Sequence, residues 1–262
     1  MTSPDSPPVR RALLTGASSG IGAALAKELA RRQISLWLGA RRTDRLAAVV
    51  DEIRAAGGTA TAVALDVADA HACARAVVAV DDDAGGLDVV IANAGVGGKS
   101  TSIWEIDVDD AAGTIATNFT GALATILPLL PRMRSRGRGH IVGISSLAAD
   151  LSQPMAPVYG ATKAAFSFFL DSVAPELELA GINVTIVHPG FVRSEMTDKN
   201  KFDMPFLVET DRAARLIADA IDARARWLRF PWQLSTVMGA AGMVPREMRA
   251  AVVRRFGPPP PK

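Results

Sequence analysis

A tyrosine and a lysine four residues apart are the residues of this chain whose spacing most clearly suggests chemistry. Tyr159 and Lys163 would share one face of a helix, and Ser146 precedes the tyrosine by 13 residues. A nearby ammonium favours ionisation of a phenol, whose free pKa is about 10. The three residues could therefore transfer a proton, although a Tyr-x-x-x-Lys spacing also occurs by chance in ordinary surface pairs.

A glycine-rich turn near the start of the chain indicates a binding site for a dinucleotide. Residues 11–22 read RALLTGASSGIG, an apolar run followed by Gly16, Gly20 and Gly22 and then by a helical pattern. A strand, a glycine turn and a helix N-terminus present backbone N–H groups and the helix dipole to a pyrophosphate. The G-x-x-x-G-x-G spacing differs from the more general G-x-G-x-x-G pattern.

Alternating strands and helices predict βαβ units and a parallel sheet. Strands are expected near 11–15, 34–39, 60–65, 87–91, 139–144, 182–188 and 227–230, and helices near 20–32, 43–56, 69–82, 107–135, 158–179 and 210–224. The residues singled out for chemistry then follow the strands. In open α/β sheets, ligands bind at the carboxyl ends of the strands.

Composition favours one soluble α/β domain. The chain has 262 residues, 49% of them hydrophobic and 21% charged, with a formal net charge of +2. The arginines are scattered, so nothing indicates nucleic-acid binding. The single cysteine, Cys73, has only His71 nearby, which excludes a disulfide framework and predicts no metal site. A reducing compartment, the cytoplasm, fits best.

The domain is expected to span 10–262, after a disordered lead at 1–9. A substrate lid is expected near 191–208 and a C-terminal tail at 231–262. The stretch 111–131 carries no charge, which suggests a membrane span, but it contains several threonines, Asn118 and Pro128. A buried or interface helix explains it better.

Six motifs in order resemble the short-chain dehydrogenase/reductase family over residues 10–230. They are TGASSGIG at 15–22, NAG at 93–95, Asn118, Ser146, YGATK at 159–163 and PGFVRS at 189–194. The resemblance implies a Rossmann-type, doubly wound parallel sheet of about seven strands with helices on both faces. It also implies a nicotinamide dinucleotide cofactor and hydride transfer between an alcohol and a carbonyl.

The same resemblance implies roles for individual residues. Tyr159 would be the general acid/base, Ser146 would donate a hydrogen bond to the substrate oxygen, and Lys163 would contact both the tyrosine and the cofactor ribose. Asn118 would hold a water that links Lys163 to solvent, although it could instead satisfy helix carbonyls. The implied cofactor-binding residues are Gly16, Ser18, Ser19, Gly20, Ile21, Arg41, Arg42, Asp66, Val67, Asn93, Ala94, Tyr159, Lys163, Pro189, Val192 and Ser194.

The end of the second expected strand favours NADP(H) over NAD(H). Arg41 and Arg42 stand where an NAD-binding protein would offer a carboxylate to the ribose, and guanidinium groups can bind a 2′-phosphate. Either arginine could instead be a solvated loop residue. By resemblance Asp66 would accept a hydrogen bond from the adenine amino group, but it could equally cap the following helix. Asn93 is expected to brace neighbouring strands.

Three features qualify the resemblance. Pro175 is expected to bend the helix that carries Tyr159, Ser194 replaces the threonine common in the family, and His188 is expected to be a packing residue rather than a catalyst.

The sequence therefore predicts a cytoplasmic NADP(H)-dependent oxidoreductase that acts on a carbonyl or secondary alcohol. A non-catalytic NADP(H)-binding sensor or scaffold is one alternative, and a reductase at a lipid surface is another, suggested by tryptophans, methionines and arginines in the tail. The resemblance implies a homodimer or homotetramer built on the helices near 107–135 and 158–179, where Phe168 and Phe169 could contribute. Apolar residues at 191–208 favour a bulky apolar substrate.

Overall fold

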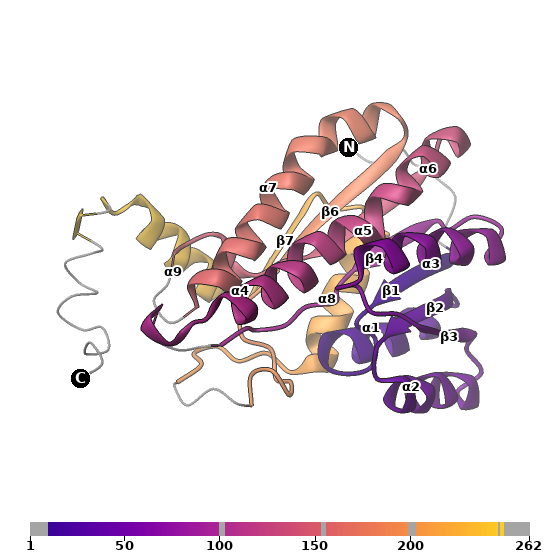
Figure 1. Cartoon of the computed structure of the whole chain (residues 1–262), viewed down its shortest axis with the longest axis horizontal. Helices are drawn as coiled ribbons and strands as arrows, with labels where there is room; N and C mark the ends of the chain where they lie inside the picture. Colours follow the sequence, from indigo (N-terminus) through magenta and orange to yellow (C-terminus); the bar gives the residue numbers. More distant parts are fainter. Residues whose placement is uncertain (1–9, 100–102, 153–155, 199–202, 246, 249–262) are drawn as a thin grey trace.

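A computed structural model describes residues 10–99, 103–152, 156–198, 203–245 and 247–248 of the chain (Figure 1). The expected lead at 1–9 and the end of the expected tail lie outside the described residues, as does part of the expected lid.

The described strands form one seven-stranded parallel sheet in the order β3-β2-β1-β4-β5-β6-β7. Its strands are β1(Arg11–Thr15), β2(Ser35–Ala40), β3(Ala60–Ala64), β4(Val89–Ala92), β5(Gly139–Ile144), β6(Ile182–Pro189) and β7(Trp227–Phe230). This confirms the expected fold class. The strand order reverses between β1 and β4, and a crevice that can receive a ligand opens at such a point.

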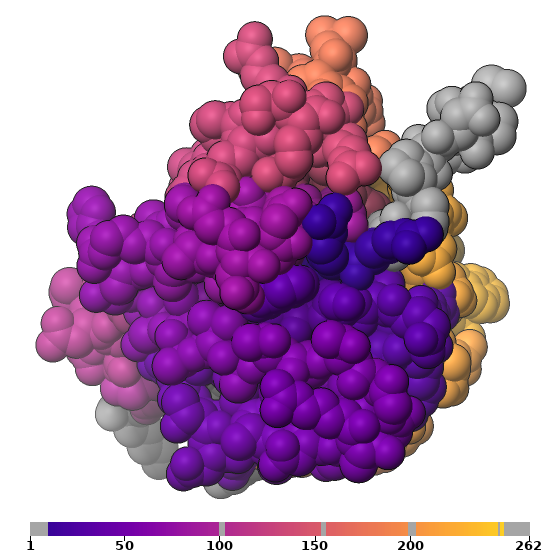
Figure 2. Space-filling model, turned by 90° about the vertical axis from the view of Figure 1, so that its right-hand side faces the viewer, coloured from indigo at the N-terminus to yellow at the C-terminus, as the bar shows by residue number. Residues whose placement is uncertain are grey.

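Helices cover both faces of the sheet. On one face lie α1(Gly20–Arg31), α2(Thr43–Ala55) and α8(Thr210–Asp222), and on the other α3(Ala70–Asp83), α5(Gly121–Ile126), α6(Leu130–Arg136) and α7(Pro157–Leu179). The central strands β4 and β5 are buried along their whole length, which explains why β4 is apolar throughout and β5 is apolar apart from His140. Figure 2 shows the side of the molecule that the first third of the chain largely covers.

The expected continuous helix at 107–135 is wrong in detail. The chain instead forms α4(Val108–Ile115), a π-helical turn η2(Ala116–Thr120), α5, a 3-10 turn η3(Leu127–Leu129) and α6. Pro128 cannot donate a backbone hydrogen bond, and the hydroxyls of Thr117 and Thr125 bond to carbonyls four residues earlier. π-helical turns are frequent at functional sites, and this one carries Asn118.

The segment Val108–Arg136 is also the described helical run that is long and apolar enough to cross a membrane by length and composition. Half of its most apolar window is buried inside the domain. Helices that pack in the core of a soluble protein have this character too, so the run is weak evidence for a membrane span.

Helix α7 ends at Leu179, as expected, and it continues through Pro175. The expected tail contains a helix that was not predicted, α9(Trp232–Met243). The apolar residues of α9 are not gathered on one face, so hydrophobic periodicity did not reveal this helix. Of the two phenylalanines considered for an interface, Phe168 is exposed, whereas Phe169 packs against the core.

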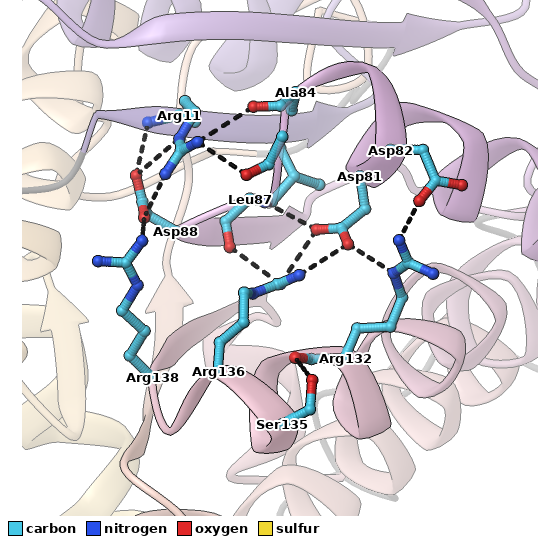
Figure 3. Close-up of polar contacts among 11 residues, drawn as sticks. Arg11, Asp81, Asp82, Ala84, Leu87, Asp88, Arg132, Ser135, Arg136 and Arg138 are labelled. Atoms are coloured by element: carbon cyan, nitrogen blue, oxygen red, sulfur yellow. Dashed lines mark hydrogen bonds and ion pairs between the residues drawn. The ribbon is translucent and has the colours of Figure 1, made fainter.

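A cluster of ion pairs around the buried carboxylate of Asp81, here called the Asp81 clamp, lies at the amino-terminal ends of the strands (Figure 3). Ligands bind at the opposite, carboxyl ends of the strands. Asp81, at the end of α3, accepts hydrogen bonds from Arg132 Nε at 2.6 Å, from both terminal nitrogens of Arg136 at 2.8 and 3.0 Å, and from Leu87 N at 2.7 Å. Burial alone would raise the pKa of Asp81, but these donors lower it overall. The clamp therefore ties α3 and the turn before β4 to α6.

We predict that Asp81→Ala lowers the free energy of unfolding by about 3 kcal/mol, because the buried Leu87 N–H and two guanidinium groups lose the buried carboxylate that accepts from all three. Asp82→Ala is the matched control. Asp82 is an exposed partner of Arg132, so its removal should cost less than about 1 kcal/mol. Urea unfolding measures both variants.

The difference in free energy of unfolding between the wild type and Asp81→Ala should also depend on pH. The folded-state pKa is lowered, so the stabilisation is complete above the unfolded-state value of about 3.9 and is lost as the pH falls through the folded-state value. If Asp81→Ala and Asp82→Ala lost the same free energy of unfolding at neutral pH, the stabilising role assigned to Asp81 would be contradicted.

Candidate functional site

Four side chains that were expected to act together come from three elements at the carboxyl ends of the strands. Ser146 follows β5 and caps the short helix η4(Leu147–Ala149), its Oγ accepting from Ala148 N at 3.1 Å. Tyr159 and Lys163 lie on the first turns of α7, and Asn118 lies in η2. The structure therefore places all four of these predicted residues near one another.

The Tyr159 phenol lies close enough to Ser146 for the serine to affect its ionisation. Burial raises the pKa of the Tyr159 phenol above its usual value, and the nearby Ser146 only partly opposes this. The expected lowering of this pKa by Lys163 is therefore wrong for the protein without ligands. The Lys163 ammonium lies 5.9 Å from the centre of the tyrosine ring, and desolvation of the phenolate outweighs its influence.

The Lys163 ammonium is held by a backbone carbonyl. Lys163 is 5% exposed, and its Nζ donates to Ile144 O, at the end of β5, at 2.8 Å. Burial lowers the pKa of Lys163 to about 8. A Cβ added to Gly95 would lie only 3.4 Å from this Nζ and 3.3 Å from Asn118 Oδ1, so the glycine leaves room between the two side chains.

Asn118 joins η2 to the loop after β4. Its Oδ1 accepts from Val96 N at 2.8 Å, and its Nδ2 donates to Val96 O at 2.9 Å and to Thr162 Oγ1 at 3.2 Å. The alternative that Asn118 satisfies carbonyls of its own helix is therefore wrong. Thr114 and Thr117 hydroxyls bond to such carbonyls instead.

The glycine turn has the shape needed for a dinucleotide. Gly16 has φ +71°, and a Cβ there would lie 2.7 Å from Ala94 Cα, while a Cβ on Gly22 would lie 2.2 Å from Gly16 O. Asn93 Nδ2 donates to Thr15 O at 2.8 Å and so braces β1 against β4, as expected. The backbone at the start of α1 can thus approach a pyrophosphate closely, so the residues present fit this group.

Arg41 and Arg42 have different surroundings. Arg41 lies 3.7 Å from Asp66 and is well exposed. Arg42 reaches the glycine turn, where its Nη2 donates to Ser19 Oγ at 2.5 Å and its Nε to Ser18 Oγ at 3.4 Å. The sequence interpretation missed Arg45, which lies one helical turn beyond Arg41 on α2 and also points toward this region through its ion pair with Glu195.

Asp66 does not cap the following helix, so that alternative is wrong. Its Oδ1 accepts from Ala68 N at 3.0 Å within the loop, and Asp69 caps α3 by accepting from Ala72 N at 2.9 Å. Val67 is buried under Gly121, where a Cβ would lie 2.6 Å from Val67 O. The loop after β3 is thus held rigidly beside the crevice.

The two ends of the expected lid lie side by side in the structure. Val192 pairs with Val208 in an isolated parallel bridge, supported by the bonds Arg193 N to Val208 O at 3.0 Å and Val208 N to Phe191 O at 2.9 Å. Ser194 lies next to the glycine turn, since a Cβ on Gly20 would be 3.3 Å from Ser194 Cβ. The described part of the segment expected to form a lid therefore borders the same crevice.

A shallow pocket with about 200 Å³ of empty space, part of it open to solvent, lies beside Tyr159. It is lined by Gly97, Gly98, Lys99, Ile106, Asp110, Ala111, Thr114, Val158 and Tyr159. Lys99 forms ion pairs with Asp107, at 3.1 Å, and with Asp110. Most of the lining is small or apolar, and its one cation is paired.

His188 is a packing residue, as expected: its ring contacts Trp227 edge-on, and it also takes part in polar contacts. It is buried, and its Nε2 lies 2.8 Å from Ser167 Oγ, which donates to Ser145 Oγ at 2.7 Å; Ser145 in turn donates to Lys163 O at 3.0 Å. Its Nδ1 lies 3.0 Å from Asp150 Oδ1, without the alignment of a hydrogen bond. This chain of contacts supports the backbone behind Lys163.

The other residues considered for chemistry lie outside this site. His140 is buried against Thr185, and burial lowers its pKa to about 3. Burial raises the pKa of the Cys73 thiol, which contacts Thr125. Among the described residues, no three His, Cys, Asp or Glu side chains are grouped as they would be around a metal ion.

A glycine turn and a Ser-Tyr-Lys group at the switch point of a parallel sheet are matched by a known family. The family model for short chain dehydrogenases matches residues 10–204. The chain belongs to the short-chain dehydrogenase family. It is therefore an oxidoreductase of a family that binds nicotinamide cofactors.

Known members resemble this short-chain dehydrogenase over nearly its whole length. An uncharacterized oxidoreductase of Myxococcus xanthus is 44% identical over 247 residues, 94% of this chain and 97% of the relative. A fatty acyl-CoA reductase of Mycobacterium tuberculosis is 32% identical over 94% of this chain and 84% of its own. The structure of a Sphingobium yanoikuyae short-chain dehydrogenase in complex with NADPH has a TM-score of 0.79 and 28% identity, covering 91% of this chain and 97% of that one.

We predict that Lys163→Met changes how stability depends on pH. The folded-state pKa of Lys163 is about 8 against 10.5 for the free side chain, so the unfolded chain binds more protons in this interval. Wild-type stability should therefore rise from about pH 8 to 10 relative to the variant, by about 2 kcal/mol. Urea unfolding of both proteins across this range measures the difference. If the difference in free energy of unfolding between the two proteins did not change with pH, the Lys163 ammonium would not be buried.

Proposed function

We propose that this protein is an NADP(H)-dependent oxidoreductase that transfers a hydride between the nicotinamide and a carbonyl or secondary alcohol, with Tyr159 as the general acid/base. The observation that carries the proposal is the grouping of Ser146, Tyr159 and the buried Lys163 at the same strand ends as the glycine turn. A non-catalytic sensor would not need all of these side chains together.

The cofactor, when bound, supplies or accepts the hydride. In the direction of reduction, Tyr159 donates its phenolic proton to the carbonyl oxygen while Ser146 donates a hydrogen bond to the same oxygen. Lys163 would hold the ribose of a bound cofactor and, as a cation, would favour the tyrosinate left behind. Asn118 holds the loop after β4 in place and lies beside Lys163, where a water could connect the ammonium to solvent.

The protonation state of Tyr159 favours reduction in neutral solution. Because burial raises the pKa of the phenol, the proton to be donated is present before the carbonyl compound binds. A general acid of this kind supplies about 10²- to 10⁴-fold in rate. Oxidation of an alcohol requires the tyrosinate and should be faster at higher pH.

The choice of NADP(H) rests on the guanidinium groups beside the glycine turn. Arg42 contacts both serines of the turn, and Arg41 lies at the end of β2, where the ribose of a bound cofactor would lie. Guanidinium groups bind phosphate through paired, charge-assisted hydrogen bonds. The NADPH complex of the Sphingobium relative supports the same assignment.

The substrate is proposed to be a bulky, apolar carbonyl compound. Met196, in the described part of the expected lid, is more than 40% exposed, and its Cγ would lie 3.5 Å from a Cβ on Gly97, which lines the pocket. A methionine beside a pocket of small residues can adapt to a long apolar chain. The expected contribution of Phe202 lies outside the described residues. The fatty acyl-CoA reductase among the relatives supports an apolar substrate.

We predict that the protein binds NADPH more tightly than NADH and that Arg41→Asp lowers this preference at least tenfold, because the new carboxylate repels the 2′-phosphate. Arg75→Asp, which makes the same charge change on the exposed surface of α3, is the control and should leave the preference unchanged. Isothermal titration gives the dissociation constants. Tighter binding of NADH by the wild type would refute the assignment.

Tyr159→Phe should reduce kcat at least a hundredfold while NADPH affinity stays within about twofold, since only the proton donor is lost. Steady-state kinetics and cofactor titration separate the two effects. Lys163→Ala should weaken both, because Lys163 is assigned to the ribose and to the tyrosine. Retention of more than about a tenth of wild-type kcat, a barrier change below about 1.4 kcal/mol, would exclude Tyr159 as the acid/base group.

A further inference from the structure

A carboxylate from the expected lid, that of Glu195, forms ion pairs with two arginines that follow β2, Arg42 and Arg45. Glu195 follows Ser194 directly, and its Oε2 lies 2.8 Å from Arg42 Nη1. Its Oε1 pairs with Arg45 Nη1. Hydrogen bonds from Arg42 and Arg45 lower the pKa of Glu195, so this carboxylate is ionised at neutral pH.

The arginine bound by Glu195 is the one that contacts the glycine turn. Through its other nitrogens, Arg42 donates to Ser18 and Ser19, and the same guanidinium holds Glu195. A carboxylate and a phosphate present similar oxygen atoms to a guanidinium group, and both accept paired hydrogen bonds from it. Glu195 therefore uses guanidinium donors that a 2′-phosphate bound at these arginines would also need.

The segment that carries Glu195 is joined to the domain independently of these arginines. The Val192–Val208 bridge and the ion pair between Arg193 and Glu209, at 3.0 Å, hold the base of the lid. Glu195 itself is about half exposed. Its side chain can therefore leave the arginines while the base of the lid stays in place.

We propose that Glu195 is a specificity-determining residue whose carboxylate substitutes for the 2′-phosphate in the free protein and competes with it for Arg42 and Arg45. The proposal rests on the proposed use of NADP(H). NADPH has to displace the carboxylate before its phosphate can bind, which reduces its apparent affinity. NADH carries no 2′-phosphate and leaves the ion pairs of Glu195 intact. Glu195 therefore reduces the difference in affinity between NADPH and NADH.

The test compares Glu195→Gln with Glu209→Gln. Both variants remove one negative charge from a glutamate near the base of the lid, but Glu209 pairs with Arg193 rather than with the arginines of the cofactor site. Isothermal titration with NADPH and with NADH at low ionic strength gives four variant dissociation constants, to be compared with those of the wild type. Circular dichroism spectra and melting temperatures establish that both variants are folded.

Glu195→Gln should bind NADPH about three- to tenfold more tightly than the wild type does, which is the effect of removing exposed ion pairs that compete with the ligand. Its affinity for NADH should stay within about twofold, as should both affinities of Glu209→Gln. Unchanged or weaker NADPH binding by Glu195→Gln would overturn the proposal, and so would equal gains in the two variants, since these would reflect net charge alone.

The result is distinguishable from failure of the proposed cofactor assignment. If the wild type binds NADH more tightly than NADPH, that assignment fails. A selective gain for NADPH in Glu195→Gln would still support competition at these arginines. If the wild type prefers NADPH and Glu195→Gln leaves the ratio of the two dissociation constants unchanged, the cofactor assignment stands and the role of Glu195 is refuted.

Discussion

The burial of one ammonium group beside one phenol is the constraint on which the candidate site depends. Lys163 is almost fully buried, and its charge is stabilised by the carbonyl of Ile144 at the end of β5. A buried cation shifts toward its neutral form, whereas a buried phenol holds its proton more strongly. Both shifts occur here, so the Tyr159 phenol keeps its proton at neutral pH and the pKa of Lys163 is about 8.

The rest of the fold keeps these two side chains in this environment. Strand β5 supplies the carbonyl, η2 supplies Asn118, and Gly95 leaves the space between them. Behind the lysine, Ser145, Ser167 and His188 form a buried chain of polar contacts. The ion-pair clamp of Asp81 lies at the opposite edge of the sheet, so the charges that hold the helices together are separate from those that titrate in the site.

Much of this arrangement could be predicted from the sequence because it rests on local patterns. The seven strands and the glycine turn followed from apolar runs and glycine spacing, and the i, i+4 relation placed Tyr159 and Lys163 on one face. Helix α9 was missed because its apolar residues have no helical periodicity. The π-helical turn at Asn118 was missed because tertiary bonds to Val96 and Thr162 favour it, and no local signal reveals them.

The electrostatic details were the least predictable part of the site. The pKa of Tyr159 depends on the balance between burial and nearby charge, and only the folded environment shows that burial prevails. The pairing of Glu195 with Arg42 and Arg45 joins segments about 150 residues apart in sequence. A run of arginines after a strand indicated an anion site, but it gave no sign that the protein itself provides a competing anion.

The central claim is that this site reduces a carbonyl group with a hydride from NADPH and a proton from Tyr159. The most direct measurement uses NADPH labelled with deuterium at C4 of the nicotinamide, on the face that reacts, with unbranched ketones of increasing chain length. We expect the label on the carbinol carbon of the alcohol, and we expect kcat/KM to rise with chain length. Consumption of NADPH without label in the alcohol, or no turnover with any ketone in the series, would contradict it.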